Sequence, residues 1–228
     1  MSERERHQAV YDRVFSHGGY GGVYDLHYRH SCYYPLFRRV LRELRQRGSR
    51  RLLEVGCATG AFAHLLFERT DLDYRGFDLS PVAIERAINR TGRADRFFVA
   101  DATESSSYAG VYDSVVCTEV LEHIPNDLDV IKQWKAGAFC VCSVPNFDAD
   151  THERFFGREA EVRARYGNLL DITRIVRLRK PALSDISLAN YLRAVRWNRY
   201  RPRRLAELLG LATFDAAGGW FVFVGTKR

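Results

Sequence analysis

The 228-residue sequence lacks any uninterrupted apolar stretch of membrane-spanning length, and its N-terminal segment MSERERHQAV is charged, without the apolar core of a signal peptide. We therefore expect a soluble, cytoplasmic protein with no membrane partner. The sequence also has no repeat, low-complexity tract or Pro/Gly/Ser-rich linker. With 46% hydrophobic residues, it is long enough for one sizeable core and short for two, which predicts a single domain over residues 1–228.

Paired cysteine motifs are absent as well. None of the five cysteines (Cys32, Cys57, Cys117, Cys140 and Cys142) forms a CxxC pair. Three of them lie inside apolar, strand-like runs, which suits buried reduced thiols. The pattern indicates neither a disulfide framework nor a zinc knuckle.

The net charge of +7 is concentrated in one window between Ile172 and Ala206. The window holds a single acid, Asp185, against ten basic residues: Arg174, Arg177, Arg179, Lys180, Arg193, Arg196, Arg199, Arg201, Arg203 and Arg204. Such a run is either a solvated helical surface or a landing surface for an anionic substrate or nucleic acid. Both interpretations stay open at this point.

Apolar strand-like runs alternate with helical patterns from residue 51 onward. The predicted strands are 51–55, 73–79, 96–101, 112–120 and 138–145, and the predicted helices are 60–70, 80–90, 128–134 and 201–211. Ser80 and Pro81 supply an N-cap and a first-turn proline for the second of these helices. This alternation predicts an α/β fold with a doubly wound, mostly parallel sheet.

The remaining segments surround this alternating core. We expect an N-terminal helical lid over 1–48, a cofactor-binding half over 49–146, a substrate-side helical insertion over 147–201, and a C-terminal helix and strand pair over 202–228. The strand pair is expected within ATFDAAGGWFVFVGTKR, with the Gly218-Gly219 step near the final strand.

The segment LLEVGCATGAF, residues 52–62, joins the first predicted strand to the first helix. Gly56 and Gly60 let the backbone approach a ligand and leave amide N–H groups at a helix N-terminus, where a carboxylate or phosphate is favoured. Asp78 ends the second strand, where an acid can accept hydrogen bonds from both ribose hydroxyls of a nucleoside. Asp101 ends the third, where an acid and its neighbouring amide could contact an adenine edge.

Four segments, LLEVGCATGAF, YRGFDLSPVAIERA, FFVADAT and YDSVVCTEVLEHI, resemble the successive motifs of class I S-adenosylmethionine-dependent methyltransferases over about residues 50–146. The resemblance implies a Rossmann-like sheet of seven strands ending in a reversed hairpin, with S-adenosylmethionine as cofactor. It implies Glu54, Gly56 and Gly60 at the methionine end, Asp78 at the ribose, Asp101 with Ala102 at the adenine, and further contacts from Cys57, Leu79 and Thr118. Ala58 stands where the family often has another glycine. The same residue leaves a dinucleotide-binding G-x-G-x-x-G motif incomplete.

The stretch CTEVLEHIPN places Glu119, Glu122 and His123 at the end of the fourth strand. Three roles are open. The residues could shape the cofactor pocket only; His123 could act as a general base beside Glu122; or all three could project from one helical turn and bind Mg²⁺ or Mn²⁺. The metal pattern resembles that of ubiquinone-pathway O-methyltransferases and of small-RNA 2′-O-methyltransferases, and His152 is the candidate fourth ligand.

The aromatic segment before the first strand offers Tyr24, His27, Tyr28 and His30 as substrate contacts. The function expected is O-methylation of a small molecule, such as a sugar, polyol, phenolic ring or natural-product intermediate. An anionic acceptor would suit the arginines of the basic window. RNA 2′-O-methylation, metal-free N-methylation of a small molecule and a binding-only pseudoenzyme are the alternatives.

Overall fold

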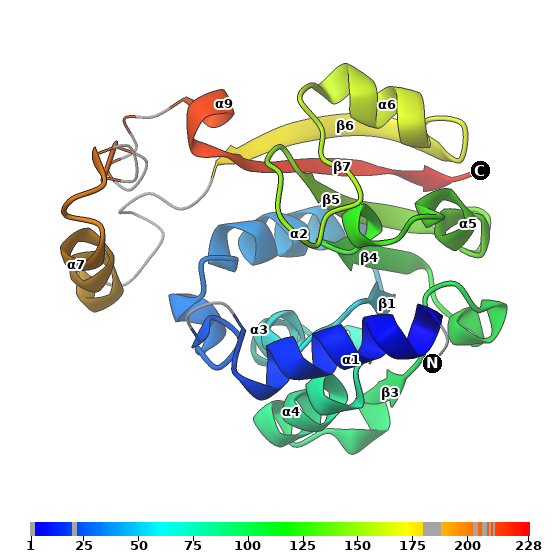
Figure 1. The fold of residues 1–228 in the computed structure, drawn as a ribbon. Helices are drawn as coiled ribbons and strands as arrows, with labels where there is room; N and C mark the ends of the chain where they lie inside the picture. Colours follow the sequence, from blue (N-terminus) through cyan, green and yellow to red (C-terminus); the bar gives the residue numbers. More distant parts are fainter. Residues whose placement is uncertain are drawn as a thin grey trace.

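The computed structural model describes residues 3–19, 22–179, 188–202, 205–206, 209, 211 and 213–228. Its centre is one seven-stranded sheet in the order β3-β2-β1-β4-β5-β7-β6 (Figure 1). The strands are β1 (Arg51–Val55), β2 (Asp73–Asp78), β3 (Phe97–Val99), β4 (Ser114–Thr118), β5 (Phe139–Pro145), β6 (Leu170–Arg179) and β7 (Gly219–Lys227). The first five are mutually parallel, and β7 runs antiparallel to both β5 and β6. The predicted doubly wound, mostly parallel sheet is confirmed.

The helices follow the strand rhythm expected from the sequence. They are α1 (Glu3–Ser16), α2 (Tyr34–Arg47), α3 (Ala61–Arg69), α4 (Pro81–Thr91), α5 (Asp127–Lys132), α6 (Glu159–Tyr166), α7 (Leu188–Trp197) and α9 (Phe214–Ala217), with short 3₁₀ turns that include η2 (Tyr28–His30) and η5 (Leu121–His123). The Ser80 hydroxyl caps α4 by accepting the amide N–H of Ala83 at 3.1 Å.

The C-terminal strand pair differs from the prediction. Among the described residues of the last segment, β7 is the single strand, and its antiparallel partner β6 comes from the region expected to be a helical insertion. Arginines at 174, 177 and 179 interrupt the apolar pattern of β6, because this strand lies at the sheet edge and half of its side chains face solvent. Parts of the predicted helix 201–211 lie outside the described residues.

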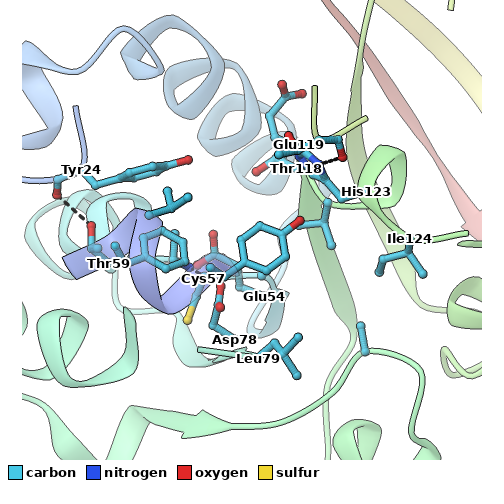
Figure 2. Close-up of a pocket in the computed structure, with 18 of the residues that line it drawn as sticks. Tyr24, Glu54, Cys57, Thr59, Asp78, Leu79, Thr118, Glu119, His123 and Ile124 are labelled. Carbon is cyan, nitrogen blue, oxygen red and sulfur yellow. Dashed lines mark hydrogen bonds between the residues drawn. The ribbon is translucent and has the colours of Figure 1, made fainter. Parts of the chain in front are cut away.

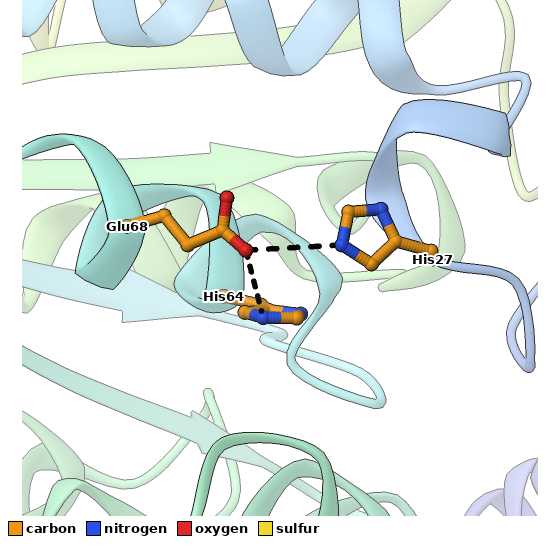
Figure 3. A group of neighbouring side chains, drawn as sticks. All are labelled: His27, His64 and Glu68. Carbon is orange, nitrogen blue, oxygen red and sulfur yellow. Dashed lines mark ion pairs between the residues drawn. The ribbon is translucent and has the colours of Figure 1, made fainter.

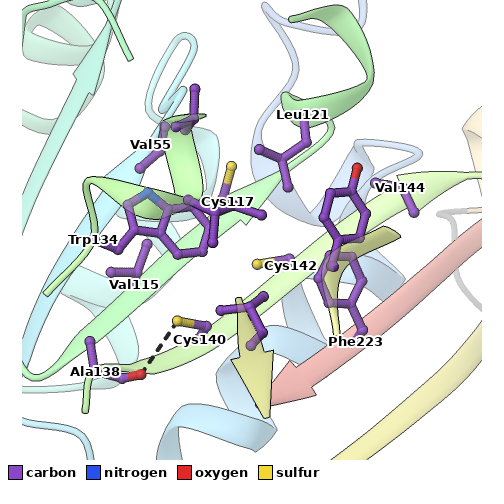
Figure 4. Close-up of a cluster of buried hydrophobic side chains, with 14 of the residues drawn as sticks. Val55, Val115, Cys117, Leu121, Trp134, Ala138, Cys140, Cys142, Val144 and Phe223 are labelled. Carbon is purple, nitrogen blue, oxygen red and sulfur yellow. Dashed lines mark hydrogen bonds between the residues drawn. The ribbon is translucent and has the colours of Figure 1, made fainter. Parts of the chain in front are cut away.

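Two apolar cores cover the two faces of the sheet. One packs α2, α3 and α4 against β1, β2 and β5, and the other packs α5 and α6 against the opposite face. Cys117, Cys140 and Cys142 lie in the second core as buried free thiols, as predicted (Figure 4). Because both faces are covered, the strand ends are the part of the sheet left to bind a ligand.

The segment before β1 contains the helices α1 and α2 and the turn η2. In Figure 1, α1 lies alongside α4 at the ends of the strands, and α2 packs on the sheet near β5. The Arg86 guanidinium on α4 donates to the Ser16 carbonyl oxygen at 2.9 Å, and Arg90 donates to the backbone carbonyl oxygens of Tyr24 and Leu26. Within the described residues, no helix is long and apolar enough to cross a membrane.

Candidate active site

A cavity of about 800 Å³ lies at the carboxyl ends of β1, β2 and β4, and α1 forms one of its walls (Figure 2). This is the edge of an open α/β sheet where ligands gather, and the size suits a nucleoside cofactor together with part of an acceptor. Among the predicted cofactor residues, the lining includes Glu54, Gly56, Cys57, Asp78, Leu79, Asp101, Ala102 and Thr118.

Gly56 begins the loop between β1 and α3 with a φ of +72°. A side chain there would be strained by the left-handed backbone, and its Cβ would clash with Cγ2 of Val120. The amide N–H groups of Gly56 and Cys57 both bond to the Phe77 carbonyl oxygen at 2.9 Å, which ties the loop to the end of β2. The glycine thus keeps the floor of the cavity open.

Gly60, the second glycine of the predicted cofactor loop, lies directly before α3. It is the N-cap of α3 and does not line the cavity. A Cβ at this position would stand 2.9 Å from the Cβ of Ala87 on α4. Gly60 therefore allows the two helices to pack closely, and its contribution to a cofactor site is indirect.

Asp78 closes β2 and is 8% exposed. Its two carboxylate oxygens accept the amide N–H groups of Ala58 and Ser80, each at 3.0 Å. Burial raises the pKa of this carboxyl to about 6, against the opposing effect of the Ser80 and Ala58 amides. Each oxygen keeps a second lone pair, so the carboxylate can still accept hydrogen bonds from a diol.

Glu54 lies at the end of β1 and is 3% exposed. The Tyr74 hydroxyl donates to its Oε2 at 2.6 Å, yet burial raises the pKa of this carboxyl to about 8. At neutral pH, Glu54 therefore carries a proton in the ligand-free protein and can lose it when a cation binds nearby.

Asp101 lines the cavity beside α1. Its Oδ1 accepts the amide N–H of Thr103 at 2.8 Å, and its Oδ2 lies 3.6 Å from the Nε of Arg4 on α1. Arg4 also pairs with Glu104, and Asp12 on the same helix accepts the Ser80 hydroxyl. These contacts join α1 to the ends of β2 and β3, where the cofactor residues were predicted.

Glu119 lines the cavity from the end of β4, with a φ of +56° that is uncommon for a non-glycine residue. Its Oε1 accepts the Ser143 hydroxyl at 2.7 Å, and its Oε2 accepts the Trp220 indole N–H at 2.6 Å. Because η5 begins only at Leu121, Glu119 does not share a helical turn with Glu122 and His123. The expectation that these three side chains project from one turn is therefore wrong.

His152 instead joins Glu122 and His123. The three residues each offer one ligand atom, and these atoms all lie within 4.8 Å of one another. His123 Nδ1 lies 2.8 Å from the Thr151 carbonyl oxygen, an arrangement that places the proton on Nδ1 and leaves Nε2 as the basic nitrogen. Its Nε2 lies 4.0 Å from the Glu122 Oε1. Burial lowers the pKa of His123 to about 4, so the ring is neutral at pH 7.

Glu122 is fully buried behind the cavity wall, and neither carboxylate oxygen has a hydrogen-bond partner among the described residues. Burial, together with the charge of Glu119, raises its pKa well above the usual range. A buried polar group without a partner is costly. This cost is the strongest sign that Glu122 serves something other than stability.

The predicted substrate residues separate into two places. Tyr24 lines the cavity, whereas His27, Tyr28 and His30 do not belong to its lining. The Tyr28 ring is fully buried, and its hydroxyl donates to Glu68 on α3 at 2.5 Å. Tyr28 thus packs into the domain, whereas His27 and His30 are exposed.

Three further aromatic residues of the lining were not among the predicted site residues. Tyr11 and Phe15 come from α1, and Phe147 comes from the loop after β5. The Tyr11 and His123 rings meet edge-on with centroids 6.1 Å apart, and Phe15 meets Tyr24 in the same way at 5.0 Å. An apolar stripe on α1 could have indicated Tyr11 and Phe15, but only the tertiary structure shows which surface that helix covers.

A family model described as a methyltransferase domain matches residues 26–210. The chain belongs to this family. This match confirms the prediction, made from the motifs, of a class I S-adenosylmethionine-dependent methyltransferase. The cavity lies where that family's cofactor is expected.

Individual relatives of this methyltransferase match it over shorter stretches. A trans-aconitate 2-methyltransferase from Rhodococcus jostii strain RHA1 is 31% identical over 122 residues, which cover 51% of this chain and 46% of that protein. A ubiquinone biosynthesis O-methyltransferase from Escherichia coli O127:H6 is 34% identical over 89 residues, 36% of each chain. The chain thus spans less than half the length of these curated relatives.

The fold of the methyltransferase also matches solved structures. A chain in the Haloferax volcanii complex containing the Trm112 methyltransferase activator aligns with a TM-score of 0.61 and 18% identity, over 96% of this chain and 97% of that one. At this identity the match supports the fold alone.

Proposed function

We propose that the chain transfers the methyl group of S-adenosylmethionine to a hydroxyl of a small molecule, and that Glu122, His123 and His152 hold a divalent cation beside the acceptor. The observation that carries the proposal is the buried Glu122 carboxyl, which lies beside two imidazoles and has no hydrogen-bond partner in the described chain.

The cavity fits the cofactor. Asp78 would accept the ribose hydroxyls, since its carboxylate is already oriented by two backbone amides. Glu54 would face the cationic methionine end, and the open backbone at Gly56 would allow close approach. Once bound, S-adenosylmethionine supplies an electrophilic methyl carbon on a sulfonium, so what remains for the protein is to align the acceptor and free its lone pair.

The acceptor would lie between α1 and the end of β4. Tyr11, Tyr24 and Phe147 provide apolar surface there, and Glu119 and His123 provide polar groups. Without a bound cation, the neutral His123 ring has an unprotonated Nε2, which can accept the acceptor's hydroxyl proton.

The residues also fit a divalent cation. One carboxylate and two imidazoles are common ligands of Mn²⁺ and related ions, and a cation would compensate the otherwise unpaired Glu122. Such an ion would lower the pKa of an acceptor hydroxyl and orient it. Glu119, predicted as a further ligand, would more simply shape the site, because its oxygens already accept from Ser143 and Trp220.

Charge favours a neutral acceptor over RNA or an anionic small molecule. Asp78, Asp101, Glu119 and Asp150 line the cavity, besides Glu54, which is protonated at neutral pH. Among its described lining residues, Arg4 is the single arginine or lysine, and it pairs with acids.

The described arginines of the basic window do not line the cavity. On β6, Arg174 pairs with Glu43 and Arg177 pairs with Glu159. A shallow or absent salt dependence of binding to a short RNA is therefore expected, and a steep slope would favour RNA methylation.

The test is methyl transfer from labelled S-adenosylmethionine to a panel of phenols, polyols, sugars, amines and a short RNA. We expect EDTA to abolish turnover on a hydroxyl acceptor and Mn²⁺ or Mg²⁺ to restore it. Full activity in EDTA would disprove the metal role and leave His123 as a metal-free base. Labelling of an amine alone would favour N-methylation.

A further inference from the structure

A second cluster of ligand atoms lies outside the cavity, on the outer side of α3. His27, His64 and Glu68 each offer one atom, and these atoms all lie within 4.8 Å of one another (Figure 3). His64 and Glu68 stand four residues apart on α3, a spacing that places both side chains on one helix face. His27 reaches them from the residue before η2.

We propose that His27, His64 and Glu68 form a zinc-type cation site that fastens the segment around η2 to α3. The site does not depend on the proposed methyl acceptor, because none of its residues lines the cavity.

The distances suit a first-row transition ion. His64 Nε2 lies 3.3 Å and His27 Nε2 lies 3.8 Å from the same Glu68 oxygen, Oε1. Ligands bound tetrahedrally to Zn²⁺ at about 2.1 Å stand about 3.4 Å apart, so the observed spacing needs only small side-chain movements. Two imidazoles and a carboxylate are also the ligand set of open zinc sites.

The surroundings orient the carboxylate for this purpose. The Tyr28 hydroxyl donates to Glu68 Oε2 at 2.5 Å, and Arg29 donates to the same oxygen at 3.3 Å. The other oxygen, Oε1, is thereby directed at the two histidines. Hydrogen bonds of this kind typically orient metal-binding carboxylates.

The proton positions set the expected strength of binding. His27 Nδ1 accepts the Arg29 amide N–H at 3.3 Å, and His64 Nδ1 is buried without a partner in the described chain, so both rings favour a proton on Nε2 when no ion is bound. Ion binding at Nε2 moves both protons to Nδ1, which costs free energy. Binding is therefore expected to be weaker than at a closed four-ligand zinc site.

Occupancy would act on the cavity wall. His27 lies three residues after Tyr24, whose ring lines the cavity and whose carbonyl oxygen accepts the Thr59 hydroxyl at 2.9 Å. Fastening His27 to α3 would hold this part of the wall in place.

The experiment titrates Co²⁺ and Zn²⁺ into a His123→Ala/His152→Ala background, which removes the other cluster. Calorimetry should give one ion per chain, Co²⁺ should show ligand-field absorption, and Zn²⁺ should raise the unfolding temperature. Adding His64→Ala or Glu68→Gln should weaken binding at least tenfold and abolish the thermal shift. Adding His17→Ala, which removes an imidazole that contacts the Arg13 carbonyl oxygen, should change neither.

Two results would overturn the site: no binding by the background protein, or equal affinity after His64→Ala and Glu68→Gln. The Glu68→Gln variant preserves side-chain shape and covers the case in which His64→Ala does not fold.

Discussion

Replacing Glu122 with methionine should stabilise the metal-free protein. The Glu122 side chain is fully buried, and its oxygens have no hydrogen-bond partner in the part of the chain that the structure describes. Methionine has a similar length and no comparable polar group to desolvate. An unpartnered buried polar group costs about 1–3 kcal/mol, and for a chain of this size each kcal/mol shifts the unfolding temperature by about 2–4 °C. We therefore expect an increase of roughly 2–12 °C in EDTA.

The same substitution at Glu119 is the matched control. Glu119 accepts hydrogen bonds from Ser143 and Trp220, so Glu119→Met leaves both donors unpartnered and should lower the unfolding temperature. Thermal unfolding followed by circular dichroism compares the two variants with the wild type.

Adding Mn²⁺ tests whether Glu122 binds a cation, apart from its effect on the stability of the metal-free protein. In a His64→Ala background, which removes the second cluster, Mn²⁺ should raise the unfolding temperature of the protein that keeps Glu122 and leave that of Glu122→Met unchanged, because the latter lacks the carboxylate that the ion would bind. Methyl transfer should be lost in Glu122→Met. A Glu122→Met protein that is less stable than wild type in EDTA would refute the reasoning, since it would mean that the carboxyl stabilises the fold.

Three further outcomes follow from the cofactor half of the cavity. Burial raises the pKa of Asp78 to about 6. Wild-type affinity for S-adenosylmethionine, measured by calorimetry, should therefore be constant above pH 6 and fall up to about tenfold per pH unit below it. The Asp78→Asn variant should bind weakly at every pH, without that slope. Burial raises the pKa of Glu54 from 4.5 to about 8, so wild-type stability should decline as pH rises through this interval. In denaturant titrations Glu54→Gln should lack that decline. The same pH dependence of stability in both proteins would contradict the prediction. Gly56→Ala should lower the free energy of unfolding by about 1–3 kcal/mol and should also lower cofactor affinity. The control is Gly92→Ala, which has a similar φ but open space around its Cβ, so it should cost only the left-handed backbone strain of about 1–2 kcal/mol. Equal losses of stability would show that the contact with Val120 is unimportant.

The parallel half of the fold was predictable because its signals are local. Strands such as Arg51–Val55 are short apolar runs buried on both faces, and Ser80 with Pro81 marks a helix start. The strand β6 (Leu170–Arg179) was missed, because an edge strand tolerates arginines that resemble a solvated loop. Its identity depends on pairing with a strand about fifty residues away, which local pattern does not encode.

The candidate site divides in the same way. Asp78 and Gly56 follow strands directly, so their place at the sheet edge could be read from spacing. Glu119 and Glu122 could not be separated, because the positive φ at Glu119 turns its side chain toward Trp220, a residue 101 positions away. His152 was found only as a candidate, and its position beside His123 depends on the path of the loop after β5.

The most direct test of the proposed activity is to identify the methylated atom. The purified chain, labelled S-adenosylmethionine, Mn²⁺ and an acceptor found in the panel would be combined, and the product located by NMR. The account predicts a methyl group on a hydroxyl oxygen, with no product from Asp78→Asn or Glu122→Met at matched concentrations. Transfer to nitrogen, or undiminished transfer by Glu122→Met, would contradict it.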